Sequence, residues 1–158
     1  MFPLICWMRP MIAITYNVRK NMHRHDQIDM IIQQLNHRND VAAAYLFGSF
    51  PKEPIFNDID LLILYHKQLS HAYSDYEISD LIATHLNIST DSIDLIPFDL
   101  NKVSPLILIR AVTDGILIKD SASDYLSDQL EALSQYFIEN EPCLYYRNQY
   151  LVELYSND

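Results

Sequence analysis

The chain has 158 residues, of which 49% are hydrophobic and 20% charged, and it contains only 2 glycines. This length suits a single domain with a sizeable buried core. The scarcity of glycine excludes glycine-rich linkers and multi-glycine nucleotide loops such as GxGxxG or the Walker A sequence. The 11 basic and 21 acidic residues give a formal net charge of −10, which argues against direct binding of a nucleic acid.

The N-terminal segment and the cysteines indicate where the protein works. Cys6 and Cys143 lie at opposite ends of the chain, without the spacing of a zinc site or a disulfide framework, which is typical of a reducing compartment. No apolar run has the length of a signal-peptide core or a membrane helix. We therefore expect a cytoplasmic protein with no membrane association. Residues 1–20 have no clear period and are expected to be an N-terminal extension, with a weak strand candidate at 11–16, before a working domain at 21–158.

The hydrophobic pattern of that domain alternates between the helical and the strand period. Helical spacing of apolar residues predicts helices at 26–39, 74–86, 106–112 and 123–155. Ser104 before Pro105 has the form of a helix cap, and Pro142 predicts that the last segment is two helices or one kinked helix. Short apolar runs predict four strands, at 41–47, 58–65, 92–97 and 116–119. This order indicates an α/β (α+β) single domain, with a mixed sheet of about four strands flanked by helices.

The strongest group of chemical residues lies between the first two expected strands. Gly48 and Ser49 directly follow the first strand, and Asp58 and Asp60 open the second. Residues i and i+2 of a strand share a face, so the two carboxylates project side by side and suit a magnesium ion. Glycine allows the backbone to approach a phosphate, to which a turn can donate hydrogen bonds. A surface turn whose aspartates cap a strand would explain the same residues, with about even odds.

A third carboxylate favours the catalytic reading. Asp94 lies between apolar neighbours in the third expected strand, where burying a charge is costly unless it has a partner. A metal held by Asp58 and Asp60 on a neighbouring strand would supply that partner. An acid at such a site can also accept the proton of an attacking hydroxyl. The alternative is an aspartate on the solvated face of an edge strand.

These motifs resemble the minimal nucleotidyltransferases of the DNA polymerase beta superfamily. The resemblance rests on LFGS at 46–49, NDIDLLIL at 57–64, the isolated Asp94 and LILIRAVTDGILIKD at 106–120, and it covers about residues 22–155. It implies a nucleotidyltransferase-like fold with C-terminal helices. It further implies that Asp58, Asp60 and Asp94 hold two Mg²⁺ ions, with ATP bound at Gly48 and Ser49.

Many stand-alone members of this family are antitoxins paired with a HEPN-domain RNase toxin. The resemblance implies transfer of AMP from ATP to a hydroxyl of that toxin, most plausibly a tyrosine, with Asp94 as the base nearest the acceptor. The spacer of eight residues between Ser49 and Asp58 is shorter than is usual in the family. Phe50-Pro51-Lys52 also replaces the usual small-Arg-Gly, and Lys52 is expected to take over the positive charge toward the nucleotide.

Two other functions remain open at this point. The shortened loop suggests a catalytically weak or inactive antitoxin that neutralises its partner by binding. Such binding would involve C-terminal helices rich in tyrosine, since tyrosine is favoured at recognition surfaces; these are Tyr136, Tyr145, Tyr146, Tyr150 and Tyr155. A small-molecule transferase is disfavoured, because 158 residues leave no room for an acceptor domain.

Overall fold

The computed structural model describes residues 23–66 and 71–155. The expected extension at 1–20, including the strand candidate at 11–16, lies outside these residues. The elements follow one another as α2 (Arg24–Asn36), β1 (Val41–Phe47), β2 (Ile59–Tyr65), α3 (His71–Leu86), the short 3-10 helix η1 (Thr90–Ser92), β3 (Ile93–Pro97), α4 (Pro105–Asp114), β4 (Ile116–Asp120) and α5 (Ser123–Tyr155). The four strands expected from the apolar runs are therefore confirmed, with bounds that differ by a residue at most.

The strands form one mixed sheet in the order β3-β2-β1-β4. β1 pairs antiparallel with both β2 and β4, whereas β2 and β3 run parallel. The central strand β1 is buried along its whole length, as expected of an uninterrupted apolar run. β3 lies at one edge of the sheet, and β4 lies at the other.

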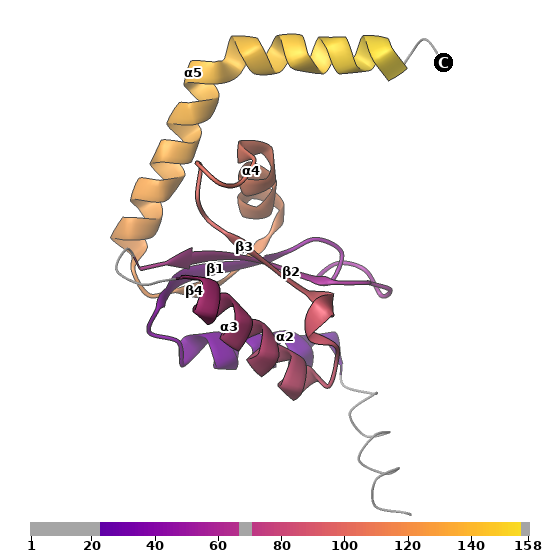
Figure 1. The fold of residues 1–158 in the computed structure, drawn as a ribbon, viewed down its shortest axis with the longest axis vertical. Coiled ribbons are helices and arrows are strands. Elements are labelled where there is room, and N and C mark those ends of the chain that lie inside the picture. The colour runs from indigo at the N-terminus through magenta and orange to yellow at the C-terminus, as the bar shows by residue number, and fades with distance from the viewer. Residues whose placement is uncertain (1–22, 67–70, 156–158) are drawn as a thin grey trace, which may run out of the picture.

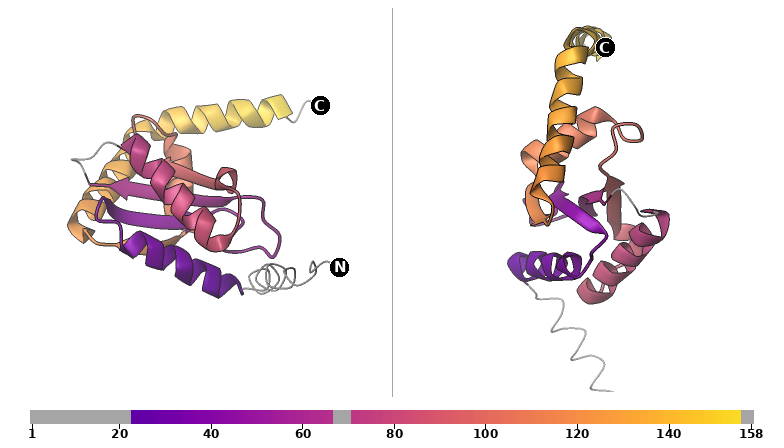
Figure 2. Two further views of the ribbon diagram at one scale, coloured as in Figure 1. Left: turned by 60° about the horizontal axis from the view of Figure 1, so that its bottom comes forward. Right: turned by 90° about the vertical axis from the view of Figure 1, so that its left-hand side faces the viewer.

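Helices cover both faces of the sheet. Figures 1 and 2 show α2 and α3 on one face and α4 with the first part of α5 on the other. Alternating strand residues supply the two cores. Leu61 and Ile63 of β2 belong to the cluster packed against α2 and α3, while Leu62 and Leu64 belong to the cluster packed against α4 and α5.

The C-terminal segment is a single helix that bends. α5 covers Ser123–Tyr155 without a break, and Figure 1 shows its axis turning before the helix continues past the sheet. Of the two arrangements that Pro142 allows, the structure has the kinked helix, because a proline removes one helical hydrogen bond without ending the segment. None of the helices in the described residues is long and apolar enough to cross a membrane.

Candidate active site

The turn after β1 is built around a glycine that has no room for a side chain. Gly48 has a φ of 76°, the left-handed conformation that glycine adopts readily. A Cβ atom at this position would lie 2.0 Å from Oδ2 of Asp60. The backbone of the Gly48-Ser49 turn therefore lies directly against the Asp60 carboxylate.

The parallel pairing of β2 and β3 brings the third aspartate beside the first two. Asp60 is the register partner of Asp94 across the two strands. Burial raises the pKa of Asp60, and the negative charges of Asp94 and Asp58 raise it further. Asp60 shares its strand face with Leu62 and Leu64, so the carboxylates lie on the side of the sheet that α4 and α5 cover.

Of the two environments considered for Asp94, the structure has the solvated face of an edge strand and not the buried position. Asp94 is exposed, and so is Asp58, whereas Asp60 is half-buried. The reason is the position of β3, which is an edge strand with only β2 beside it in the sheet. The carboxylates are therefore brought together by strand register, and the resulting site is open to solvent on one side.

The carboxylates have the chemistry of a magnesium site. Carboxylate oxygens are the ligands that Mg²⁺ prefers. The pKa of Asp60 is raised first by burial and then by the negative charges of Asp94 and Asp58, and a divalent cation would offset this repulsion. Asp58, Asp60 and Asp94 thus carry the donor atoms that the ion prefers. As the side chains stand, the described residues contain no group of three His, Cys, Asp or Glu side chains that could hold a metal ion.

The segment between Ser49 and Asp58 is anchored rather than loose. The Ser49 carbonyl accepts hydrogen bonds from the backbone N–H groups of Lys52 and Glu53, at 3.0 and 2.8 Å. Phe50 is fully buried in the core beneath α2 and α3, and its ring contacts that of Phe56 edge to face, with centroids 4.8 Å apart. Lys52, the cation expected at the nucleotide, is exposed in this turn.

Sequence reasoning missed Arg24, which contacts the same segment from the start of α2. Its guanidinium lies 4.3 Å from the centroid of the Phe50 ring and 4.2 Å from that of Phe56. Nothing in the local sequence pattern could have found this contact, since it joins a helix terminus to a distant loop. The neighbouring His23 and His25 are exposed at the N-terminus of α2.

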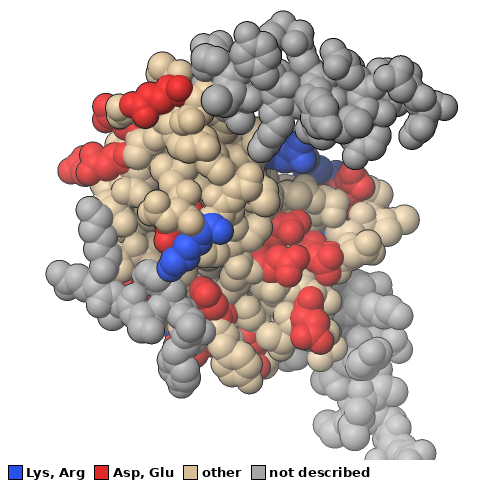
Figure 3. Space-filling view, turned by 45° about the horizontal axis from the view of Figure 1, so that its top comes forward, with Lys and Arg blue, Asp and Glu red and all other residues tan. Residues whose placement is uncertain are grey.

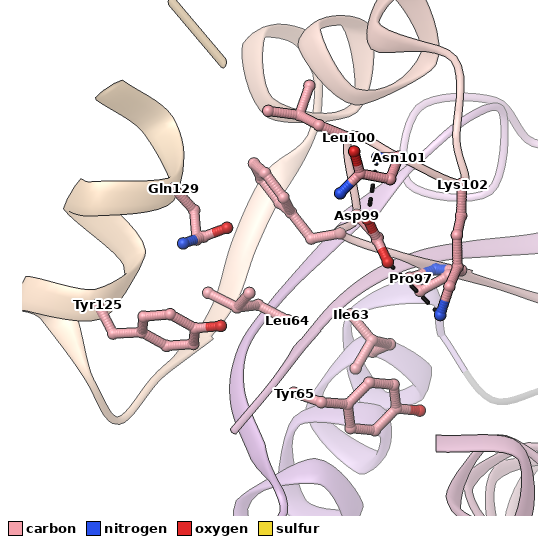
Figure 4. A pocket seen from close by; sticks show the side chains of 11 residues that line it. Ile63, Leu64, Tyr65, Pro97, Asp99, Leu100, Asn101, Lys102, Tyr125 and Gln129 are labelled. Atoms are coloured by element: carbon pink, nitrogen blue, oxygen red, sulfur yellow. Dashed lines mark hydrogen bonds and ion pairs between the residues drawn. The ribbon is translucent and has the colours of Figure 1, made fainter. Parts of the chain in front are cut away.

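The pocket drawn in Figure 4 lies away from the carboxylates. It has a volume of about 330 Å³ and lies at the carboxyl ends of β2 and β3, whereas the three aspartates lie near the opposite ends of these strands. Tyr125 and Gln129 of α5 lie across it from residues 99–102, and Asp99 pairs with Lys102 at 3.5 Å. The candidate site at the three aspartates is therefore a separate, open acidic surface. On the face drawn in Figure 3, acidic side chains likewise gather in a cluster.

The family of the chain follows from its sequence profile. Residues 29–124 match the family described as Polymerase beta, Nucleotidyltransferase, which is more than half of the chain and contains β1 to β4 with all three aspartates. The protein belongs to this nucleotidyltransferase family, and the resemblance read from its motifs is confirmed. No curated protein sequence matches the chain.

Solved toxin–antitoxin complexes contain chains of similar fold. One is the complex of tri-AMPylated Shewanella oneidensis HEPN toxin with MNT antitoxin: the matched chain is 19% identical, the match covers 82% of this chain and 99% of that one, and the TM-score is 0.57. In a toxin–antitoxin structure with AMP-PNP, the matched chain is 20% identical, the match covers 78% of this chain and 98% of that one, and the TM-score is 0.59. In the toxin–antitoxin MntA-HepT, the matched chain is 19% identical, the match covers 80% of this chain and 98% of that one, and the TM-score is 0.57. These similarities establish a nucleotidyltransferase-like fold.

Proposed function

We propose that this protein is a magnesium-dependent nucleotidyltransferase that transfers AMP from ATP to a hydroxyl, most plausibly a tyrosine, of a cognate HEPN toxin, and so acts as its antitoxin. The observation that carries the proposal is the grouping of Asp58, Asp60 and Asp94 beside the Gly48 turn in a chain of the nucleotidyltransferase family. The reaction is proposed to take place in the cytoplasm, where ATP is available.

Proteins of similar fold support the choice of nucleotide and acceptor. One of the complexes contains a HEPN toxin that carries three AMP groups, and another contains AMP-PNP, an ATP analogue. A site that handles an adenine nucleotide and a partner toxin thus occurs on this fold.

The residues of the site divide into two groups by chemistry. Asp58, Asp60 and Asp94 would hold two Mg²⁺ ions, and Gly48 and Ser49 would bind the ATP phosphates through the backbone N–H groups of the turn. The exposed Lys52 would add a positive charge toward the phosphates. When bound, the ions would neutralise the phosphates and stabilise the charge that develops in an in-line displacement.

The proposed transfer needs no covalent bond to the enzyme. The acceptor oxygen forms a bond to the α-phosphorus of ATP while the bond to pyrophosphate breaks, and pyrophosphate leaves with the electron pair. Asp94 would take the proton of the acceptor hydroxyl, since a carboxylate at this position can act as a general base. The Asp60 carboxylate, held against the Gly48 turn, fixes the distance between the carboxylates and the bound phosphates.

The openness of the site supports a protein as acceptor. Asp58 and Asp94 are exposed, and β3 forms the edge of the sheet, so a large partner can approach the carboxylates. A small acceptor would need walls that enclose it, and the pocket of Figure 4 lies at the other end of the strands.

The proposal is tested by the mass of the partner. A purified HEPN-domain protein encoded next to this chain is incubated with ATP and Mg²⁺, and its intact mass is measured. We expect adducts of one or more AMP groups with the wild-type enzyme and none with Asp60→Asn, which keeps the size of the side chain but removes its charge. An unmodified partner at enzyme concentrations that saturate it would overturn the proposal.

A second candidate is neutralisation by binding alone, which the shape of α5 favours. The second part of this helix stands apart from the sheet (Figure 1), and Ile138 of α5 is 74% exposed. Tyr136 packs edge to face against Phe137. The other expected tyrosines belong to a part of α5 whose side chains the structure does not describe. In either candidate, residues 21–158 are proposed to work as one unit.

A further inference from the structure

We propose that Arg24 is a positioning residue, which holds the segment between β1 and β2 in the shape that nucleotide binding requires. The inference rests on the proposed function, because it concerns the same Gly48-Ser49 turn. Arg24 itself is not a metal ligand or a base. Arg24 acts through its contacts with Phe50, with Phe56 and with the backbone of the loop. We call this set of contacts the Arg24 clamp.

Stacking is the first part of the clamp. The Arg24 guanidinium lies 4.3 Å from the Phe50 centroid and 4.2 Å from the Phe56 centroid, within the distance of a favourable cation–π contact. The two rings also contact each other, with an interplanar angle of 82°. One planar cation thereby joins the two ends of the loop, since Phe50 directly follows Ser49 and Phe56 precedes Asp58 by two residues.

Hydrogen bonds to the loop backbone are the second part. Nη2 of Arg24 donates to the carbonyl oxygens of Glu53 and Pro54, at 3.2 and 3.4 Å. Nη1 is buried and has no hydrogen-bond partner within the described chain, and burial lowers the pKa of the guanidinium. Burying part of an arginine in this way costs free energy, so the side chain is placed at the loop despite a desolvation penalty.

The position of Arg24 in its own helix argues against a role in helix stability. It is the first residue of α2, where the helix dipole disfavours a positive charge. The preceding residue, His23, makes no side-chain cap hydrogen bond. The contacts of Arg24 with the loop, rather than with α2, thus account for its conformation.

The clamp gives a physical reason why the shortened loop can still form a phosphate-binding turn. The loop lacks a second glycine and contains Pro51 and Pro54, so its backbone has few conformations to choose from. Phe50 is fully buried, which holds the loop in place directly after Ser49. The Arg24 guanidinium contacts the rings of both Phe50 and Phe56 and so holds the two ends of the loop together. Losing the guanidinium would leave Phe50 anchored but release the carbonyls of Glu53 and Pro54 and the far end of the loop.

The test compares Arg24→Met, Arg24→Lys and Arg110→Met, in which an exposed arginine of α4 serves as the matched control. Calorimetry measures the dissociation constant for ATP with Mg²⁺, and AMP transfer gives KM and kcat. We expect Arg24→Met to raise the dissociation constant and KM about tenfold with a smaller change in kcat, and Arg110→Met to change neither. We expect Arg24→Lys to resemble Arg24→Met, because an ammonium cannot stack and fork as a guanidinium does.

A structural role without positioning would give a different pattern. Arg24→Met that lowers the melting temperature but leaves ATP affinity and KM at wild-type values overturns the proposal, as does full rescue by Arg24→Lys. Phe56→Leu provides a second measurement. In the double variant with Arg24→Met, the loss of ATP affinity should be smaller than the sum of the losses in the two single variants. Fully additive effects would contradict the clamp.

The calorimetric measurement also separates this proposal from the proposed function. A wild-type protein that binds ATP but transfers no AMP contradicts the transfer reaction, while the Arg24 variants still test the clamp through affinity. A wild-type protein that binds no ATP overturns the proposed function and, with it, a role of Arg24 in nucleotide binding. Hydrogen exchange of residues 49–57 then reports whether Arg24→Met releases the loop.

Discussion

At the scale of single residues, Gly48 combines two constraints that exclude any side chain. Its φ of 76° is left-handed, and the space for a Cβ atom is taken by the Asp60 carboxylate. Gly115, the only other glycine, has an extended φ of −85° and is required for a different reason: a Cβ there would lie 2.2 Å from the Ala111 carbonyl oxygen. Both glycines are therefore structural requirements, but only Gly48 contacts a residue of the candidate site.

We predict that Gly48→Ala impairs AMP transfer far more than stability. The left-handed conformation costs about 1–2 kcal/mol with a side chain present. Displacement of Asp60 by even ~1 Å can lower the rate about 100-fold. Activity and thermal unfolding are measured on the same samples. Gly115→Ala, whose clash is with the helix backbone, should be destabilised yet keep its AMP transfer per folded molecule; equal losses in both variants would refute the distinction.

A second prediction concerns the dependence of stability on pH. The pKa of Asp60 is raised above 3.8 by burial and by the charges of Asp94 and Asp58. A raised carboxyl pKa stabilises the fold only while the group is protonated, so the metal-free protein loses this contribution as the pH rises from 3.8 through the folded-state pKa. Asp60→Asn, which stays neutral, should lack this loss.

Thermal unfolding with and without Mg²⁺ between pH 4 and pH 8 checks the pH prediction and the metal site together. Mg²⁺ should raise the melting temperature of the wild-type protein near pH 7, because a ligand that binds only the folded state stabilises it. The Asp60→Asn variant should show a much smaller increase. If the melting temperature of the wild-type protein changed with neither pH nor Mg²⁺, the acidic cluster would not be a cation site.

At the scale of the elements, one side chain joins β4 to the end of α2. The buried Lys119 donates from Nζ to the carbonyl oxygens of Leu35 and Arg38, at 2.7 and 2.5 Å. The Leu35 carbonyl lies in the last turn of α2, where it also accepts from the backbone N–H groups of His37 and Arg38, and the Arg38 carbonyl lies just beyond the helix. A positive charge is favourable at this end of a helix. Lys119 therefore acts as a helix cap supplied by a distant strand.

We predict that Lys119→Met destabilises the protein by about 2 kcal/mol, since it removes the charged donor of the Arg38 carbonyl and one of the donors of the Leu35 carbonyl. Denaturant unfolding measures this difference. Lys102→Met is the matched control: Lys102 is 67% exposed and pairs with Asp99 at 3.5 Å, an arrangement that contributes no more than about 1 kcal/mol. Similar losses in the two variants would contradict the capping role of Lys119.

Elements with a strong period were predictable from the sequence, and contacts between elements were not. The apolar run of Val41–Phe47 predicted β1 to the residue, because a buried central strand needs no partner to be recognised. Asp94 was placed in the correct strand, but its exposure depends on β3 being an edge strand, which only the strand order decides. Likewise, Phe50 seemed a departure in a nucleotide loop, and its contacts with Arg24 and Phe56 could not be predicted from the local sequence.

At the scale of the whole molecule, the two faces of the sheet differ: one is covered by α2 and α3, and the other carries the carboxylates of the candidate site. α2 and α3 cover a core that includes Phe50, and the loop is anchored from that side. On the other side, α4 and α5 cover Leu62 and Leu64 but leave Asp58 and Asp94 exposed. Because the first part of α5 lies on this face of the sheet (Figure 1), a partner bound along it would lie on the same side of the sheet as the carboxylates.

The last prediction uses this arrangement to separate catalysis from neutralisation by binding. In cells that produce the cognate HEPN toxin, the double variant Asp58→Ala and Asp60→Ala should fail to protect although it still binds the toxin. Removing two adjacent carboxylates relieves repulsion and leaves α5 intact, so its binding measured by pull-down should remain. Cell survival and toxin mass are recorded together. Protection by the double variant without AMP on the toxin would establish neutralisation by contact, and protein shortened after Asn140 should then lose protection.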